Sequence, residues 1–244
     1  MLKKYLVAAA VTIAGLAAAT AVYAATAAES TLDAKVKASP TNAGTSSNPK
    51  SEKLSLNLDG GLKPGVAGQP ETTDKIIITT PFKYRGSRWP AKSRCDNAAA
   101  DQAKSNKDCP SPSRVGKGQA NLQAANGAIR RTLELTVHVI KNGKLGIWAQ
   151  TRPGESPAVA QFIPSSISGS KISFDIPPNL EQPLGVKSSI DLLTASIGGT
   201  VSVKGKSYGI LESTSCPKGG WKFGVTFDTF TGDLKDTATQ RCRP

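Results

Sequence analysis

The stretch that decides the fold class is TLELTVHVIKNGKLGIWAQT, residues 132–151. In its first half apolar and polar residues alternate with a period of two, which is the pattern of a half-buried β-strand. The dipeptide Asn142-Gly143 then precedes a second β-prone run, and Asn-Gly favours a hairpin turn of type I′. The stretch therefore predicts a β-hairpin. The same alternation places His138 on the solvent side of its strand.

Short runs of β-branched residues recur on both sides of this hairpin. Residues 75–80 read KIIITT, and residues 221–228 are joined to residues 234–241 through Thr-Gly-Asp, with 23 glycines and 16 prolines along the chain. Many short strands with frequent turn residues predict an all-β fold, a single immunoglobulin-like or jelly-roll β-sandwich over residues 53–244. The one predicted helix is short and Ala-rich, at residues 97–104.

The N-terminal 52 residues contain two segments that differ in composition, and the first of them predicts that the protein is exported. Residues 1–24 have two lysines, a long apolar run and a Val-Tyr-Ala end, which is the pattern of a secretory signal peptide. An uncleaved membrane anchor is the alternative interpretation. Residues 25–52 are rich in Ala, Ser, Thr and Pro, so they predict a disordered tether. The predicted location is secreted, either extracellular or associated with the cell wall.

Four cysteines remain after the predicted signal peptide, and four cysteines allow three disulfide pairings. We favour the sequential pairing, Cys95–Cys109 and Cys216–Cys242, because each pair brackets a compact local unit. A zinc site is the weaker alternative, since the chain has no Cys-x-x-Cys and a single histidine. We predict no metal and no cofactor.

The pentapeptide GKSYG, residues 205–209, matches the Gly-x-Ser-x-Gly nucleophile elbow of hydrolases. That motif needs a strand running into a helix, whereas β-branched residues flank this one and predict a turn at Gly205 and Lys206 between two strands. The single histidine, His138, also precedes Ser207, which is the wrong order for that hydrolase class. We therefore predict no catalytic residues. A secreted hydrolase of envelope polysaccharide or esters remains the alternative function.

Positive charge is concentrated in one part of the chain. The net charge is +13, and residues 75–118 alone carry 10 basic and 3 acidic side chains. Cations interleaved with aromatic rings suit anionic ligands, so this stretch supplies candidate binding residues. They are Lys83, Tyr84, Arg85, Arg88, Trp89, Lys92 and Arg94. A purely solvating or structural role is the alternative, with Trp89 packed beneath the Cys95–Cys109 disulfide.

The candidate partners are an anionic cell-wall polymer, a polysaccharide or a membrane surface. The chain has no nucleic-acid recognition motif, which makes nucleic acid an unfavoured partner.

Two segments carry a resemblance to a protein family. The first has Pro90 five residues before Cys95, and after a predicted helix it reads CPSPSRVGKGQA, residues 109–120. The second, residues 213–242, has Ser-x-x-Cys, a Gly-x-Trp-x-Phe strand and a terminal Cys. Together they resemble an exported β-sandwich family of high-GC Gram-positive bacteria, over about residues 53–244. The resemblance implies the fold and carries no activity. We predict a non-enzymatic, envelope-associated binding or structural module.

Overall fold

A computed structural model describes residues 31–61, 72–95, 109–124, 128–152, 154–155, 159–181, 188–230 and 232–244. The predicted signal peptide and the predicted helix at residues 97–104 lie outside these ranges. In the described part of the chain, no helix is long and apolar enough to cross a membrane.

Nearly all of the described secondary structure is β. The strands are β1 (Thr31–Ser39), β2 (Lys50–Gly61), β3 (Thr73–Thr79), β4 (Lys83–Tyr84), β5 (Arg114–Ala124), β6 (Ile129–Val139), β7 (Leu145–Thr151), β8 (Ala160–Ser168), β9 (Lys171–Asp175), β10 (Ser188–Ile197), β11 (Thr200–Val203), β12 (Lys206–Gly209), β13 (Leu211–Ser213), β14 (Trp221–Thr229) and β15 (Gly232–Gln240). The helical elements are the single turns η1 (Gly86–Arg88), η2 (Ala91–Ser93) and η4 (Ser111–Ser113), and the short helix α2 (Pro178–Glu181).

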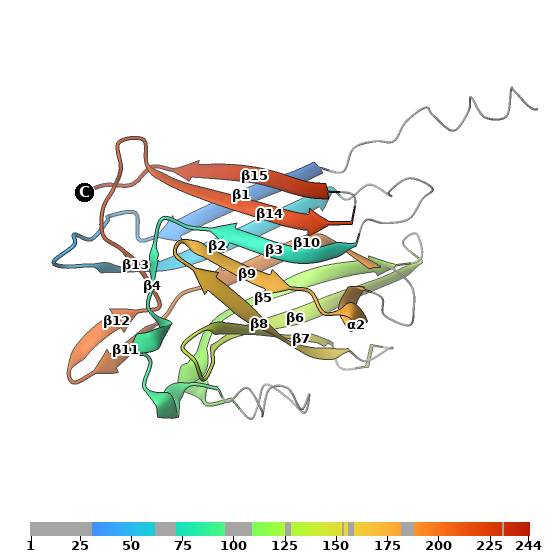
Figure 1. Cartoon of the computed structure of the whole chain (residues 1–244), viewed down its shortest axis with the longest axis horizontal. Coiled ribbons are helices and arrows are strands. Elements are labelled where there is room, and N and C mark those ends of the chain that lie inside the picture. Colours follow the sequence, from blue (N-terminus) through green and yellow to red (C-terminus); the bar gives the residue numbers. More distant parts are fainter. Residues whose placement is uncertain are drawn as a thin grey trace, which may run out of the picture.

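Thirteen strands form one antiparallel sheet in the order β15-β14-β3-β9-β8-β7-β6-β5-β10-β2-β13-β4, with β1 also paired to β2. The sheet bends back on itself, so that β14, β3 and β9 lie in front of β2, β10 and β5 (Figure 1). Strands β11 and β12 form a separate hairpin at one end. The inward-facing side chains of the two layers form one apolar core. The predicted all-β sandwich is confirmed.

Strand β1 brings the two edges of the bent sheet together. It pairs with β2 along its whole length, and side chains of β15 bond its other edge: Asp236 accepts from the Ala34 amide at 2.7 Å, and Gln240 donates to the Ala38 carbonyl at 2.8 Å. The predicted tether over residues 25–52 is therefore wrong from Thr31 onward. The inward residues there are mostly small, such as Ala34 and Ala38, and composition alone does not reveal that distant strands cover them.

The hairpin of β6 and β7 forms as predicted, with a different turn. A type I′ turn requires positive φ at both central residues. Gly143 has φ +69°, but Asn142 is not in the left-handed region, and the Gly143 amide donates to the Ile140 carbonyl at 2.8 Å. The turn is thus a three-residue connection that ends in a left-handed glycine. The turn with positive φ at both positions is Lys204-Gly205, between β11 and β12.

Both predicted disulfides are present, with Cα–Cα distances of 4.8 Å for Cys95–Cys109 and 5.7 Å for Cys216–Cys242. The second one attaches the C-terminal segment to the body of the protein. Next to it the Ala43 amide donates to the Arg243 carbonyl at 2.7 Å. These links position the segment that precedes β2 at the same end of the molecule as the C-terminus.

Candidate functional site: the basic end

The antiparallel topology brings many separate segments to one end of the sandwich. Ile197 at the end of β10 lies opposite both Leu54 of β2 and Gly116 of β5, and Glu212 of β13 lies opposite Lys83 of β4. We call this end the basic end. It comprises residues 39–53, 79–95, 109–118, 137–146, 164–172, 196–224 and 237–244.

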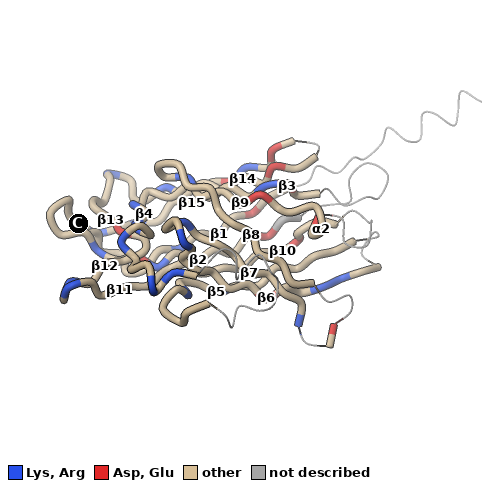
Figure 2. The backbone as a smooth tube through the Cα atoms, turned by 60° about the horizontal axis from the view of Figure 1, so that its bottom comes forward, with Lys and Arg blue, Asp and Glu red and all other residues tan. Residues whose placement is uncertain are grey.

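Charge is distributed very unequally between the two ends. The basic end carries 18 lysine and arginine residues and 2 acidic residues, Glu52 and Glu212, both buried. The other described residues carry 7 basic and 11 acidic side chains. Figure 2 shows lysine and arginine gathered around β4, β11, β12 and β13, and acidic residues near β9, β14 and α2. Among the described residues, positive charge is therefore concentrated at the basic end, and the remainder of the molecule is slightly negative.

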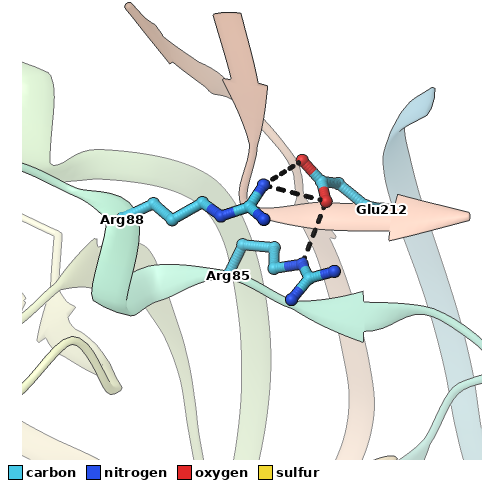
Figure 3. A network of polar contacts seen from close by, with 3 residues as sticks. All are labelled: Arg85, Arg88 and Glu212. Carbon is cyan, nitrogen blue, oxygen red and sulfur yellow. Dashed lines mark hydrogen bonds and ion pairs between the residues drawn. The ribbon is translucent and has the colours of Figure 1, made fainter. Parts of the chain in front are cut away.

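A buried carboxylate organises the centre of the basic end. Glu212 in β13 has a side chain 5% exposed and accepts from two guanidinium groups (Figure 3). Arg85, just after β4, donates from Nε at 2.9 Å. Arg88, at the end of η1, donates from Nη1 at 3.3 and 3.4 Å. The two arginines together carry one more positive charge than Glu212 neutralises.

An aromatic ring holds the second guanidinium in place. The Cζ atom of Arg88 lies 4.5 Å from the centre of the Tyr208 ring, within the range of a cation–π interaction. The Nζ atom of Lys206 lies 5.7 Å from the same centre. Lys206 and Tyr208 both belong to β12, so the β11–β12 hairpin adds a positive charge beside the arginine pair.

Of the seven predicted binding residues, four lie at the surface and three make contacts within the protein. Lys83 and Lys92 are exposed, and Arg85 and Arg88 form the site above. The others have structural contacts. The guanidinium of Arg94 donates to the carbonyls of Trp89, Ser87 and Lys141, at 2.8 to 2.9 Å.

Two predicted aromatic contact residues point inward. Trp89 is 2% exposed and its Nε1 donates to the Pro112 carbonyl at 3.0 Å, so its ring lies in the core, which agrees with the alternative structural role and not with contact to a surface ligand. The Tyr84 hydroxyl donates to the Gly143 carbonyl at 2.7 Å, and burial raises the pKa of Tyr84. The ring available to the site is Tyr208, which the sequence interpretation missed. Its signal was the pair of lysines, Lys204 and Lys206, around a hairpin turn.

His138 is buried, not solvent-facing as predicted. Its ring is covered by η4, whose Ser113 hydroxyl lies 2.8 Å from Nδ1, while Nε2 lies 3.3 Å from the Thr136 hydroxyl. Ser113 also donates to the Pro110 carbonyl at 2.6 Å. Burial first, and the nearby Arg114 second, lower the pKa of His138 to about 4. The residue is thus a neutral member of a buried hydrogen-bond network at pH 7.

Ser207 lies in the exposed hairpin opposite Ser202. The strand–turn–strand context predicted for GKSYG is confirmed, although the turn begins one residue earlier, at Lys204. The ring nitrogens of the single histidine are engaged with Ser113 and Thr136. The geometry therefore offers no support for Ser207 as a hydrolase nucleophile.

The interior contains a narrow cavity of about 60 Å³ between the two layers of the sheet. Apolar side chains of β3, β5, β6, β9 and β10 line it, and its polar lining residues are Thr73, Glu181 and Ser188. Space of this size accommodates a small apolar group and is below the roughly 150 Å³ of cavities known to bind an aromatic ring. The basic end remains the feature with the stronger chemistry.

Among the described residues, no group of three or more His, Cys, Asp or Glu side chains is arranged to hold a metal ion. The described contacts of the basic end centre on a pair of guanidinium groups ordered by Glu212, with Lys206 beside Tyr208. No known protein family, curated protein or solved structure matches this chain significantly.

Proposed function

We propose that this protein is exported and binds an anionic polymer of the cell envelope through its basic end, as a non-enzymatic binding module. The observation that carries the proposal is the charge distribution, because the described residues of that end have 18 basic side chains against 2 buried acidic ones. Such a surface raises the local concentration of polyanions and accelerates their association. The acidic opposite end favours one orientation of the molecule toward the polymer.

Two further observations support an envelope role. Both disulfides are of the kind that persists in oxidising compartments outside the cytosol. Residues 1–24 have the pattern of a secretory signal peptide. The rigid, cross-linked sandwich would hold the basic end in a fixed shape, which lowers the conformational entropy lost on binding.

Binding of the purified protein to immobilised polyanions tests the proposal. We expect retention on a phosphodiester polymer or on polyglutamate at 50 mM salt, and progressive loss toward 300 mM, because salt screens exposed charges. The variant Lys144→Ala/Lys171→Ala removes two exposed charges from the basic end and should elute at lower salt. The control Lys75→Ala/Lys235→Ala removes two charges from the other end and should elute like the native protein. Absence of retention on both polymers at 50 mM salt would refute the proposal.

A further inference from the structure

We infer that Arg85 and Arg88, ordered by Glu212 and Tyr208, form a site for a phosphodiester group of that polymer. This inference rests on the proposed function and adds the chemical class of the repeating unit. A polyol or sugar chain linked by phosphodiesters presents one such group in every repeat. The surrounding lysines then bind neighbouring repeats by charge alone.

Both guanidinium groups retain N–H donors for a ligand. A guanidinium has five N–H donors, and Glu212 takes Nε of Arg85 and Nη1 of Arg88. Among the described residues, no other hydrogen bond engages the two Nη groups of Arg85 or the Nη2 group of Arg88. The two side chains are 27% and 37% exposed, so a ligand on the surface can reach them.

Contacts within the protein order the site before any ligand arrives. Glu212 is nearly buried and holds both arginines, while the Tyr208 ring lies against the guanidinium of Arg88. Restricting two long side chains in advance reduces the rotamer entropy lost on binding. An exposed lysine carries the same charge without this preorganisation.

The charge and shape of the site also suit a phosphodiester. Arg85, Arg88 and Lys206 with Glu212 carry a net charge of +2 within one small area. The two guanidinium groups reach Glu212 on separate stems (Figure 3), so their remaining donors approach a ligand from more than one direction. The two unesterified oxygens of a tetrahedral phosphodiester can accept from two such groups at once.

A charge-conserving substitution separates this site from general electrostatic attraction. The double variant Arg85→Lys/Arg88→Lys keeps the net charge and removes the planar forks. We would compare its dissociation constants for poly(glycerol phosphate) and for polyglutamate of equal charge and length with those of the native protein. Losing one charged hydrogen bond should weaken phosphodiester binding about tenfold and leave polyglutamate binding within about twofold.

The matched control is Lys144→Ala/Lys171→Ala, which should weaken binding to both polymers by the same factor. If the arginine-to-lysine variant binds both polymers as the native protein does while this control loses affinity, the phosphodiester site is refuted and the proposed function stands. If the native protein binds neither polymer, the phosphodiester site and the proposed function are both refuted.

Two further measurements keep the test decisive. Near-ultraviolet circular dichroism establishes whether the double variant Arg85→Lys/Arg88→Lys is folded. If it is not folded, the single variant Arg88→Lys is used instead, because Arg85 then retains its bond to Glu212. Vesicles of phosphatidylglycerol present the same group in a membrane. Tighter binding to these vesicles than to the polymer would overturn the polymer assignment.

Discussion

Glu52 of β2 and Ser213 of β13 are diagonal neighbours on paired strands, and the Ser213 hydroxyl donates to Oε1 of Glu52 at 2.6 Å. The Ser213 oxygen in turn accepts from the Gly44 amide at 3.1 Å. The other carboxyl oxygen, Oε2, is buried with no hydrogen-bond partner among the described residues. Burial raises the pKa of Glu52 from 4.5 to about 7, against the smaller opposing effects of Ser213 and Lys50.

This relationship predicts that Glu52→Gln stabilises the protein at alkaline pH. The unfolded chain has the ordinary pKa, so between pH 4.5 and about 7 the folded state holds the extra proton and native stability falls as pH rises. Above about pH 7 the stability contributed by the protonated Glu52 side chain is completely lost. Glutamine stays neutral and keeps the bond from Ser213, so the variant should gain about 2 kcal/mol at pH 8 and nothing at pH 4. Denaturant unfolding at both pH values measures this difference in unfolding free energy.

The control variant Glu134→Gln, whose side chain is 45% exposed, should show no such gain. An equal gain of Glu52→Gln at pH 4 and pH 8 would contradict the explanation by the raised pKa of Glu52.

The single histidine provides a second pH test, with the opposite sign. The pKa of His138 is lowered to about 4, so the folded state binds fewer protons than the unfolded chain between pH 4 and 6.5. Stability due to this group is complete above pH 6.5 and is lost as pH falls through that window. The imidazole proton resonances, unique in the NMR spectrum, should titrate with a midpoint near 4. A midpoint near 6.5 would show that the ring is solvated.

The Cys216–Cys242 disulfide should contribute substantially to global stability. It closes a loop with a sequence separation of 26, against 14 for Cys95–Cys109. Restricting the unfolded chain over such a loop stabilises the native state by roughly 3 to 4 kcal/mol. We expect Cys216→Ser/Cys242→Ser to lower the unfolding free energy by that amount. The amide of Ala43, bonded to Arg243, should also exchange faster with solvent, and unchanged exchange there would argue against the anchoring role.

Gln240 should be important for holding β1 against β15. Its side chain donates to the Ala38 carbonyl and accepts from the Ala38 amide. Gln240→Ala leaves both backbone groups without these partners, and we expect a loss of about 1 to 2 kcal/mol. Hydrogen exchange should localise the effect to Ala38 and its neighbours in β1. The control Thr239→Ala alters the preceding residue of β15, and a loss of unfolding free energy equal to that of Gln240→Ala would contradict the specific role of the glutamine.

The amino-acid sequence alone determined the local features of this protein. The alternation in residues 132–151 predicted the β6–β7 hairpin, and the cysteine spacing predicted both disulfides, because each depends on residues close together in the chain. The context of GKSYG likewise predicted a hairpin instead of a catalytic elbow. The local sequence pattern did not predict β1. Its inward residues are small, and they form a strand only when β2 and β15 cover them.

Tertiary structure decided what the charged and aromatic residues do. Trp89 and Tyr84 lie in the basic stretch of the sequence, yet packing turns Trp89 into the core and bonds Tyr84 to the β6–β7 turn. Conversely, Tyr208 lies more than 100 residues from Arg88 and meets it only because β13 pairs with β4. Long-range strand pairing sets which charges share a surface. The basic end therefore exists in the fold and is only partly visible in the sequence.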